Sequence, residues 1–392
     1  MSHEIQGRGF LALAVSTGIA LVASAAQAAP GDVVNLGTLG GTVSGAYGIN
    51  GSGAAVGVAY LPGNASYRAF VHPGAGGSML DLGTLGGTNS HAYAINSGGA
   101  VVGWADTTGN ATWRAFKHPG SAGGAMMDLG TLGGSASEAW SVNDAGEVVG
   151  WADISNDAAI RAFKHPGTPG GAMLNLGTLG GTDSHAYGIN STGAVVGWAN
   201  TSANAAQRAF KHPGTPGEVM LDLGTLGGRD SIAHAISDDG AVVGWAHIAG
   251  NAQRAFRHPG TPGQPMQNLG TLGGSSSVAF DINDGGFVVG SASTASNVFR
   301  AALWLADNSA IDLDVWLDGV NPAAGAVWTL TEARAINEAG LIAGIGTYND
   351  GPGGLSDGVR GFILDASSLV PEPSALALLA VPALLSIRRR RR

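Results

Sequence analysis

The string LGTLGG occurs six times in this chain at almost constant spacing, and this repetition limits the possible folds more than any other feature. Successive copies start 46, 47, 47, 47 and 46 residues apart. A period this constant predicts one supersecondary unit copied in tandem. Tandem copies supply equal sets of residues, whereas catalysis usually needs one unequal set. The repeat therefore predicts an architecture and names no ligand. The copies begin at Leu36, Leu82, Leu129, Leu176, Leu223 and Leu269.

Each unit of about 47 residues divides into four strand candidates. In the copy from Ser90 to Gly134 these are residues 91–96, 100–105, 113–118 and a short strand that begins at Met126. Turn signals recur every ~8–12 residues, which is typical of antiparallel sheet. The second strand is apolar almost throughout, as in VVGWA at position 101, so we expect both of its faces to be covered. The blades of a β-propeller provide that environment.

The first strand and its turn occur seven times, so seven blades are expected. The fourth strand occurs six times within the series and once before it, at Val33–Leu36. The chain therefore begins with a fourth strand and ends with strands one to three. We predict an all-β, seven-bladed β-propeller over residues 29–369, closed by the N-terminal strand, which hides the sheet edges. The seven copies begin at Tyr47, Tyr93, Trp140, Tyr187, His234, Phe280 and Arg334.

Composition excludes several classes of function. The chain has no cysteine, which excludes disulfides and cysteine-based zinc sites. Without residues 1–28 and 371–392 the body keeps 13 of 19 basic and 26 of 28 acidic residues, a net charge of −13. An acidic body has no electrostatic footprint for nucleic acid. We expect a monomer with no cofactor, no metal site and no nucleic-acid partner.

The N-terminus has the layout of a secretory signal peptide. Arg8 is followed by an apolar stretch over residues 10–25, and Ala26, Gln27 and Ala28 then form a small-x-small cleavage site. We predict that signal peptidase removes residues 1–28 by cutting after Ala28. A first core helix is the alternative interpretation.

The C-terminus combines a proline-bracketed acid, a short apolar stretch and an arginine block. Pro371 and Pro373 flank Glu372, and residues 375–387 are almost wholly apolar. Thirteen helical residues span roughly 20 Å, less than the ~30 Å hydrocarbon core of a bilayer. The arginines are expected to remain on the cytoplasmic side. We therefore expect a C-terminal hydrophobic helix that holds an exported body at the membrane. The block comprises Arg388, Arg389, Arg390, Arg391 and Arg392.

Residues 370–392 resemble a PEP-CTERM sorting signal, with Val370 preceding the Pro-Glu-Pro triplet. The resemblance implies an exosortase-like processing enzyme as partner, a transient inner-membrane anchor and a Gram-negative source that makes extracellular polysaccharide. The protein would then reach the cell surface or the extracellular space. An ordinary membrane anchor, which would keep the arginines, is the alternative.

The repeat itself resembles the bacterial extracellular HAF-family repeats over residues 33–364. The similarity lies in the aromatic-Ala-Ile-Asn-x-x-Gly-x-Val-Val-Gly segment, in Ala-Phe of the third strand and in LGTLGG. One departure is an arginine before Ala-Phe, where the family name implies histidine. The family implies export and repetition but no activity.

Several repeated side chains could suggest chemistry, and each also has a structural interpretation. We interpret the HPG histidines as turn residues, since equivalent places on a ring lie too far apart to share one metal ion. The strand-two tryptophans are expected to pack between blades, although a lectin could present them to sugars. The arginines before Ala-Phe would pair with acids of the next blade or contact anionic sugar. These sets are His72, His118, His165, His212 and His258; Trp104, Trp151, Trp198 and Trp245; and Arg68, Arg114, Arg161, Arg208 and Arg254.

Three further features of the sequence also have structural interpretations. The acidic turns at 143–144, 238–239 and 283–284 lack the spacing of a calcium loop and are expected to be hairpin turns. Trp113, which is not repeated, is a better candidate for exposure. The irregular stretch 312–331 replaces a seventh LGTLGG and is either a degenerate repeat with an insertion or a specialised blade junction. It contains Asp312, Asp314, Asp318, Trp316 and Trp328.

The sequence therefore predicts an exported protein of the cell surface or extracellular matrix, with a non-catalytic structural or binding role linked to extracellular polysaccharide or biofilm. The alternative is a carbohydrate-active enzyme, a polysaccharide lyase or glycosidase, on the same scaffold. An enzyme would need an asymmetric acid/base set in one cleft. No catalytic residue is predicted.

Overall fold

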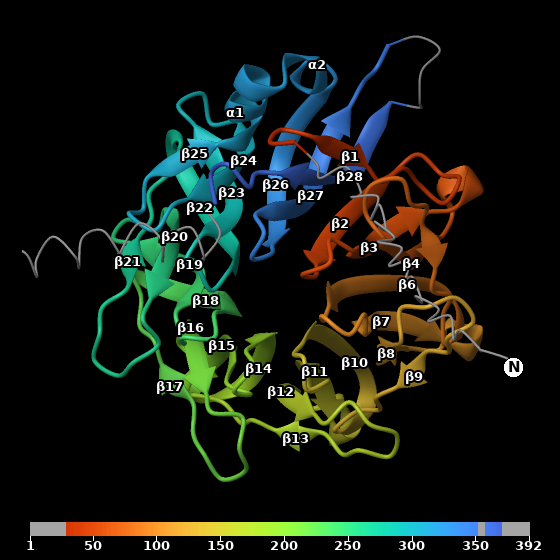
Figure 1. The fold of residues 1–392 in the computed structure, drawn as a ribbon. Coiled ribbons are helices and arrows are strands. Elements are labelled where there is room, and N and C mark those ends of the chain that lie inside the picture. The colour runs from red at the N-terminus through yellow and green to blue at the C-terminus, as the bar shows by residue number, and fades with distance from the viewer. Residues whose placement is uncertain (1–28, 352–356, 371–392) are drawn as a thin grey trace, which may run out of the picture.

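The computed structural model describes residues 29–351 and 357–370. Within these ranges the chain forms seven four-stranded antiparallel sheets, which stand around one central axis as the blades of a β-propeller (Figure 1). The predicted fold class is thus confirmed. The predicted signal peptide and the apolar C-terminal helix lie outside the described residues, and no helix within them has the length and apolar character to cross a membrane.

Six blades follow one another in chain order, each running from the axis outward. The first contains β2 (Ser44–Ile49), β3 (Ala55–Tyr60), β4 (Tyr67–His72) and β5 (Leu80–Asp81). The second contains β6 (Gly86–Ile95), β7 (Val101–Thr107), β8 (Trp113–His118) and β9 (Met127–Asp128). The third contains β10 (Gly133–Val142), β11 (Val148–Ile154), β12 (Ile160–His165) and β13 (Leu174–Asn175).

The next three blades repeat this arrangement. The fourth contains β14 (Gly180–Ile189), β15 (Val195–Thr201), β16 (Gln207–His212) and β17 (Leu221–Asp222). The fifth contains β18 (Gly227–Ile236), β19 (Val242–Ile248), β20 (Gln253–His258) and β21 (Gln267–Asn268). The sixth contains β22 (Gly273–Ile282), β23 (Val288–Thr294), β24 (Phe299–Trp304) and β25 (Ala310–Asp312). Short 3₁₀ turns η1 to η4 follow the second strand at Pro62–Asn64, Thr108–Asn110, Ser155–Asp157 and Ser202–Asn204.

The seventh blade joins the two ends of the chain. It contains β26 (Trp328–Ile336), β27 (Leu341–Tyr348) and β28 (Gly358–Asp365), and β1 (Val33–Asn35) is its outermost strand. Strand β1 pairs antiparallel with β28, with Val33 opposite Leu364 and Asn35 opposite Phe362. The predicted closure by the N-terminal strand is confirmed.

The innermost strands begin earlier than the sequence indicated. Strand β6 starts at Gly86, inside the LGTLGG string, and not at His91. The string therefore supplies both the link between blades and the start of the next inner strand. Gly86 has a φ of 100°, a conformation in which a side chain would be strained. A buried serine eight residues after the leucine fixes this link: Ser90 Oγ donates to the Gly83 carbonyl oxygen.

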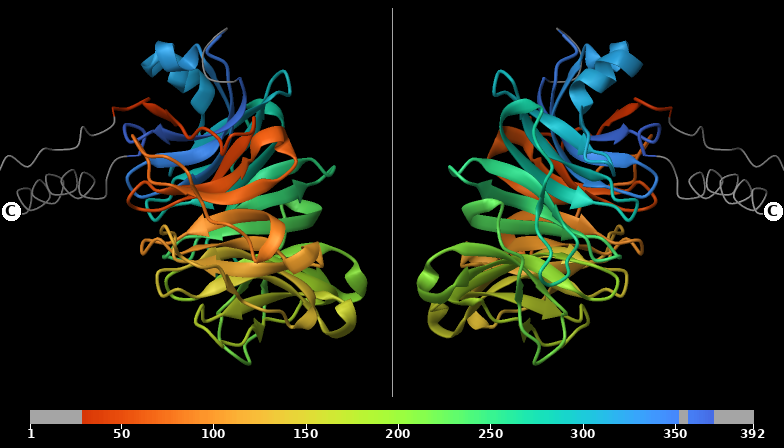
Figure 2. Two further views of the ribbon diagram at one scale, coloured as in Figure 1. Left: turned by 90° about the vertical axis from the view of Figure 1, so that its right-hand side faces the viewer. Right: turned by 90° about the vertical axis from the view of Figure 1, so that its left-hand side faces the viewer.

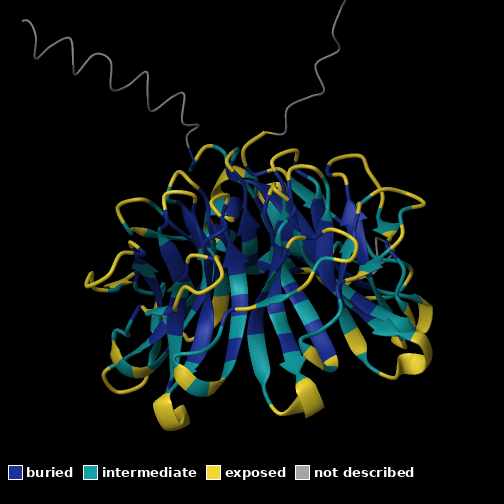
Figure 3. Cartoon of the chain, turned by 90° about the horizontal axis from the view of Figure 1, so that it is seen from below, coloured by how far each residue is buried: buried dark blue, intermediate teal, exposed yellow. Residues whose placement is uncertain are grey.

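The core lies between neighbouring blades. Each of six blades contributes one phenylalanine from its third strand, fully shielded from solvent, to its interface with the preceding blade. Exposed residues gather in the turns at the two faces (Figure 3). Glycine in the second strand allows the innermost strand to approach closely: a Cβ at Gly103 would lie 1.8 Å from the His91 carbonyl oxygen. The phenylalanines are Phe70, Phe116, Phe163, Phe210, Phe256 and Phe362.

The irregular stretch after the sixth blade forms two short helices, α1 (Leu313–Val320) and α2 (Pro322–Gly325), in place of a seventh LGTLGG. They project from the edge of the disc (Figure 2). Asp312 caps α1, since its side chain accepts the N–H groups of Asp314 and Val315. Asn321 Nδ2 donates to the Gly31 carbonyl oxygen at 2.9 Å, so the helices also hold the start of the closing strand.

Candidate functional site

The residues that repeat most regularly prove to be structural. The HPG histidines are buried at turns, as predicted: the Gly120 N–H donates to His118 Nδ1 at 2.9 Å. Three of the five arginines before Ala-Phe differ from the prediction, because they bind backbone rather than acids. The Arg68 guanidinium donates to the Thr88 carbonyl oxygen in the next blade, and equivalent bonds join Arg161 to Thr182 and Arg254 to Ser275.

The specialised junction supplies the acid that the other blades lack. Arg300 occupies the equivalent place in the sixth blade and forms an ion pair with Asp314, with 3.0 Å between Arg300 Nε and Asp314 Oδ2. The same carboxylate accepts the Leu330 N–H at 2.7 Å. Asp314 thus joins the sixth blade to the seventh where no LGTLGG link exists, which gives the stretch a structural role.

Two of the strand-two tryptophans contact a neighbouring blade, as predicted: ring centroids lie 6.1 Å apart for Trp104 and Tyr67, and 5.4 Å apart for Trp151 and His185. Trp198 makes its contacts within its own blade. It stacks on His185 with 4.6 Å between ring centroids, and its indole N–H donates to the Tyr187 hydroxyl oxygen at 3.3 Å. Trp113 keeps 40% of its surface exposed on β8.

The turns after the innermost strands form a belt around one end of the axis. Each belt asparagine donates through Nδ2 to the backbone carbonyl oxygen of the equivalent residue in the next blade, as from Asn96 to Asn143 at 3.0 Å. One junction lacks this bond, because Ser237 stands at the fifth position. These residues were predicted only as hairpin turns. The belt donors are Asn50, Asn96, Asn143, Asn190, Asn283 and Asn337.

Acidic residues follow the belt on one side of the axis. The Asp284 carboxylate accepts the Asp238 N–H at 2.7 Å, and the Glu338 carboxylate accepts the Asp284 N–H at 2.8 Å. Burial and the neighbouring charge of Asp284 raise the pKa of Glu338. We call Asp238, Asp284 and Glu338 the acidic rim.

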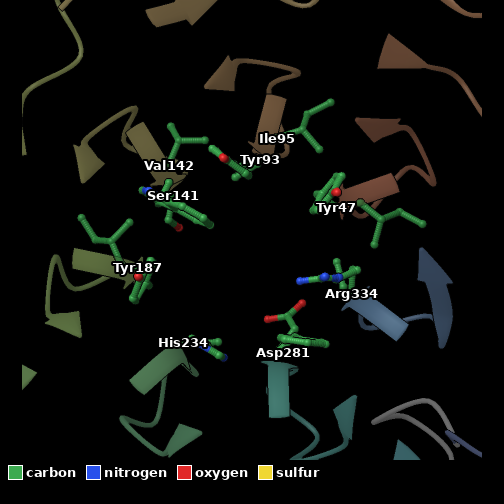
Figure 4. Close-up of a pocket in the computed structure, with 18 of the residues that line it drawn as sticks. Tyr47, Tyr93, Ile95, Ser141, Val142, Tyr187, His234, Asp281 and Arg334 are labelled. Carbon is green, nitrogen blue, oxygen red and sulfur yellow. The ribbon is translucent and has the colours of Figure 1, made fainter. Parts of the chain in front are cut away.

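A cavity of about 360 Å³ lies on the axis, lined by the last residues of all seven innermost strands. A β-bulge in each of these strands, such as the one between Ala92 and Ala94, turns one side chain toward the axis. We call these seven side chains the axial ring; Figure 4 shows several of them converging on the cavity. The axial ring comprises Tyr47, Tyr93, Trp140, Tyr187, His234, Phe280 and Arg334.

The axial ring is closed by seven successive contacts. Tyr93 and Trp140 stack with 3.9 Å between centroids, and four further steps are edge-on or stacked aromatic pairs. Arg334 completes the circle, with its guanidinium carbon 4.1 Å from the Phe280 centroid and 5.2 Å from that of Tyr47. The Glu332 carboxylate accepts from Arg334 Nε at 2.6 Å, so this cation is also paired.

Asp281 is the one acid among the residues that line the cavity. Its carboxylate accepts the Ile282 and Ile336 N–H groups, each at 2.9 Å. Part of the Asp281 surface lines the cavity, and protein atoms surround the rest of its carboxyl group. This burial raises the pKa of Asp281 to about 7. The equivalent residue in the other blades is glycine, alanine or serine, so this carboxylate is unique to the sixth blade.

A second layer of polar side chains lies two residues before the axial ring. Burial lowers the pKa of His91 to about 3 and that of His185 to about 4, and it raises the pKa of Glu138. In the ring itself, burial lowers the pKa of His234 to about 4. His234 Nδ1 lies 2.8 Å from the Ala279 carbonyl oxygen, and since a carbonyl only accepts, Nδ1 carries the proton.

The seven blades are therefore unequal where they meet the axis. Sequence reasoning missed this site, although the signal was present in the first strand, where the residue before x-Ile/Val-Asn/Ser varies between aromatic, histidine and arginine. The candidate junction at 312–331 lies at the ring's edge and brings no predicted residue to the cavity. Val370, the first residue of the predicted sorting signal, is 2% exposed and packs on the Gly340 turn.

No protein-family model and no curated protein matches the chain. Among solved structures it is similar to TolB from Acinetobacter baumannii (11% identity, TM-score 0.41, 66% of this chain and 62% of that one) and to a puromycin hydrolase (15%, 0.46, 87% and 55%). The chain thus corresponds to less than two thirds of the length of either. A third is a mutant of AofleA from Arthrobotrys oligospora (11%, 0.39, 72% and 89%).

Proposed function

We propose that the protein is an exported, non-catalytic binding protein of the cell surface or extracellular matrix, acting as a monomer, with its ligand site in the axial cavity. The observation that carries the proposal is the set of unequal side chains, Asp281 and Arg334 among them, that line one cavity on the axis. Unequal side chains that face a cavity indicate recognition of an unequal ligand.

Extracellular polysaccharide is the ligand class that we favour for the proposed location. Aromatic side chains that line the cavity, such as Trp140 and Tyr187, offer apolar surface to sugar rings, and tyrosine hydroxyls and Asp281 offer hydrogen-bonding partners. Removal of residues 1–28 by signal peptidase and processing at Pro371–Glu372–Pro373 by an exosortase-like enzyme are part of the same proposal. N-terminal sequencing and the intact mass of the mature protein test both cuts: retained arginines would count against processing.

The alternative, a polysaccharide lyase or glycosidase, is favoured by one observation. Asp281 has a pKa near neutrality, which suits a general acid or base. A glycosidase also needs a second carboxyl group across the substrate.

A glycan array combined with a reducing-end release assay on residues 29–370 separates these functions. We expect retention of a glycan without new reducing ends. The Trp140→Leu variant, altered in the axial ring, should lose retention, whereas Trp113→Leu, altered at the exposed tryptophan of β8, should keep it. New reducing ends that disappear in Asp281→Asn would establish the enzyme instead.

A further inference from the structure

The axial cavity combines aromatic walls with a carboxyl group that has no cationic partner, and from this combination we infer that it binds an organic cation through an ammonium group. The inference rests on the proposed function, since it names the ligand chemistry of the same site. It does not depend on whether the ammonium belongs to a small quaternary amine or to an amino sugar within a polysaccharide.

The axial ring already holds one cation. The Arg334 guanidinium lies over Phe280 and beside Tyr47, which shows that ring faces at this level are available to positive charge. Six of the seven ring positions carry aromatic or imidazole side chains. Burial keeps His234 neutral near pH 7, so it adds no repulsion. A second cation on the axis would meet other aromatic side chains that line the cavity, such as Trp140 and Tyr187.

Asp281 supplies the negative charge without a partner. In residues 29–351 and 357–370, no cationic side chain lies within 4.0 Å of its carboxylate. Its two hydrogen bonds come from backbone N–H groups, which leave the charge uncompensated. A buried acid in this state resists ionisation, and a nearby cation would relieve that cost. Neither water nor a protein cation stabilises the ionised carboxylate of Asp281. A ligand ammonium beside it would therefore form a favourable ion pair.

The groups that face Asp281 from neighbouring elements carry an excess of negative charge. Strand β26 brings Arg334, whose charge Glu332 offsets, and β18 brings neutral His234. The turn after β26 brings Glu338, which acts on Asp281 as a further negative charge. The other two residues of the acidic rim, Asp238 and Asp284, lie in the turns after β18 and β22, two of the strands that line the cavity. These negative charges would repel an anionic ligand, and the one cation nearby, Arg334, is already paired with Glu332. Anionic ligands are therefore disfavoured.

Isothermal titration of residues 29–370 with choline and with its neutral isostere 3,3-dimethyl-1-butanol tests the inference at pH 7.0. We expect choline to bind on the order of ten-fold more tightly, because the two differ only in charge. Asp281→Asn and Asp281→Ala should remove this difference and leave binding of the alcohol unchanged. Alanine occupies the equivalent place in other blades, so the second variant guards against misfolding.

Asp222→Asn is the matched control. It removes the same charge at the outer edge of the fourth blade, where Asn175 and Asn268 fill the equivalent positions and accept the same turn N–H. This variant should bind choline like the unmodified protein. Equal loss of binding in Asp222→Asn and Asp281→Asn would overturn the inference, because the effect would then come from net charge alone.

Glucosamine and N-acetylglucosamine distinguish the two sources of the ammonium group. Preference for glucosamine that depends on Asp281 points to an amino sugar, and preference confined to choline points to a quaternary amine. If neither ammonium compound binds more tightly than its neutral counterpart, the inference is wrong. Glycan retention that still depends on Trp140 would in that case leave the proposed function standing.

Discussion

Asn337 of the seventh blade donates a hydrogen bond to the backbone carbonyl oxygen of Asn50 in the first, at 3.0 Å, although the two residues are 287 positions apart in the chain. This bond continues the belt of asparagines across the junction between the last blade and the first. The ring is thus closed twice, once at its outer edge by β1 and once near the axis by the belt.

The belt should contribute measurably to stability. We expect Asn96→Ala to lower the free energy of unfolding by about 1–3 kcal/mol, because the Ala100 N–H loses its acceptor and the Asn143 carbonyl keeps only the Gly146 N–H as a donor. Ser237→Ala is the control, since Ser237 bonds within its own turn and not to the next blade. Urea denaturation measures both; equal effects would show that the belt bonds add nothing specific.

The closing strand should stabilise the whole domain and not the seventh blade alone. Deletion of residues 31–41 removes the β1–β28 ladder and the buried Leu36 side chain. We expect a loss on the order of 3 kcal/mol or more, seen as one cooperative transition at lower temperature. The reference is a chain that begins at Ala29. Thermal unfolding at an unchanged temperature after the deletion would contradict closure as a source of stability.

Glycine at the centre of the second strand should be indispensable. Gly103→Ala would place Cβ 1.8 Å from the His91 carbonyl oxygen, so β6 and β7 would have to separate. We expect destabilisation of more than about 3 kcal/mol, or failure to fold. Gly98→Ala is the matched change: its Cβ would lie 3.5 Å from the nearest atom, and its φ is not positive. Denaturation curves that shift equally would refute the close approach.

Acid should destabilise the protein through its buried histidines. His91, His185 and His234 have folded pKa values of about 3 to 4, below the unfolded value near 6.5, so their contribution is complete above pH 6.5 and is lost toward pH 4. Asp281 acts in the opposite sense, because its pKa of about 7 exceeds the unfolded value near 3.9 and its protonation stabilises the folded state.

Two variants separate these contributions. His185→Val, which copies Val278 of the sixth blade, should flatten the loss of stability between pH 6.5 and 4 by up to about 1.4 kcal/mol per pH unit. Asp281→Ala should steepen it, since the opposing proton uptake disappears. Unfolding free energies at four pH values in this window measure both slopes. A His185→Val variant that parallels the unmodified protein would show that this imidazole titrates normally.

The blade number and the closure could be predicted because they depend on counting. Each blade carries one first-strand copy, and Val33–Leu36 is a fourth strand that precedes the first of these copies. The closed ring could therefore be predicted without knowledge of any contact. The contact of Trp151 with the next blade also followed from its place in an apolar strand. Local pattern and global fold agree in these segments.

The variation at the axial positions was visible in the sequence, but the geometry of the site could not be predicted, because it depends on a backbone irregularity. Alternation alone does not reveal that a β-bulge at Tyr93 turns that side chain to the axis. The pairing of Asp281 with the Ile336 N–H links residues 55 positions apart, and the shared use of backbone carbonyls by Arg68 and its equivalents has no sequence signal. The sequence shows the type of each side chain, but it does not show the direction in which that side chain points.

The central claim is that the blades differ at the axis in order to bind a ligand. The most direct measurement is glycan-array and choline binding by a double variant, Asp281→Ala with Arg334→Tyr, whose axis resembles the other blades. We predict that this variant folds and unfolds near the temperature of the unmodified protein and has lost binding. Binding that survives unchanged in a folded double variant would contradict the claim.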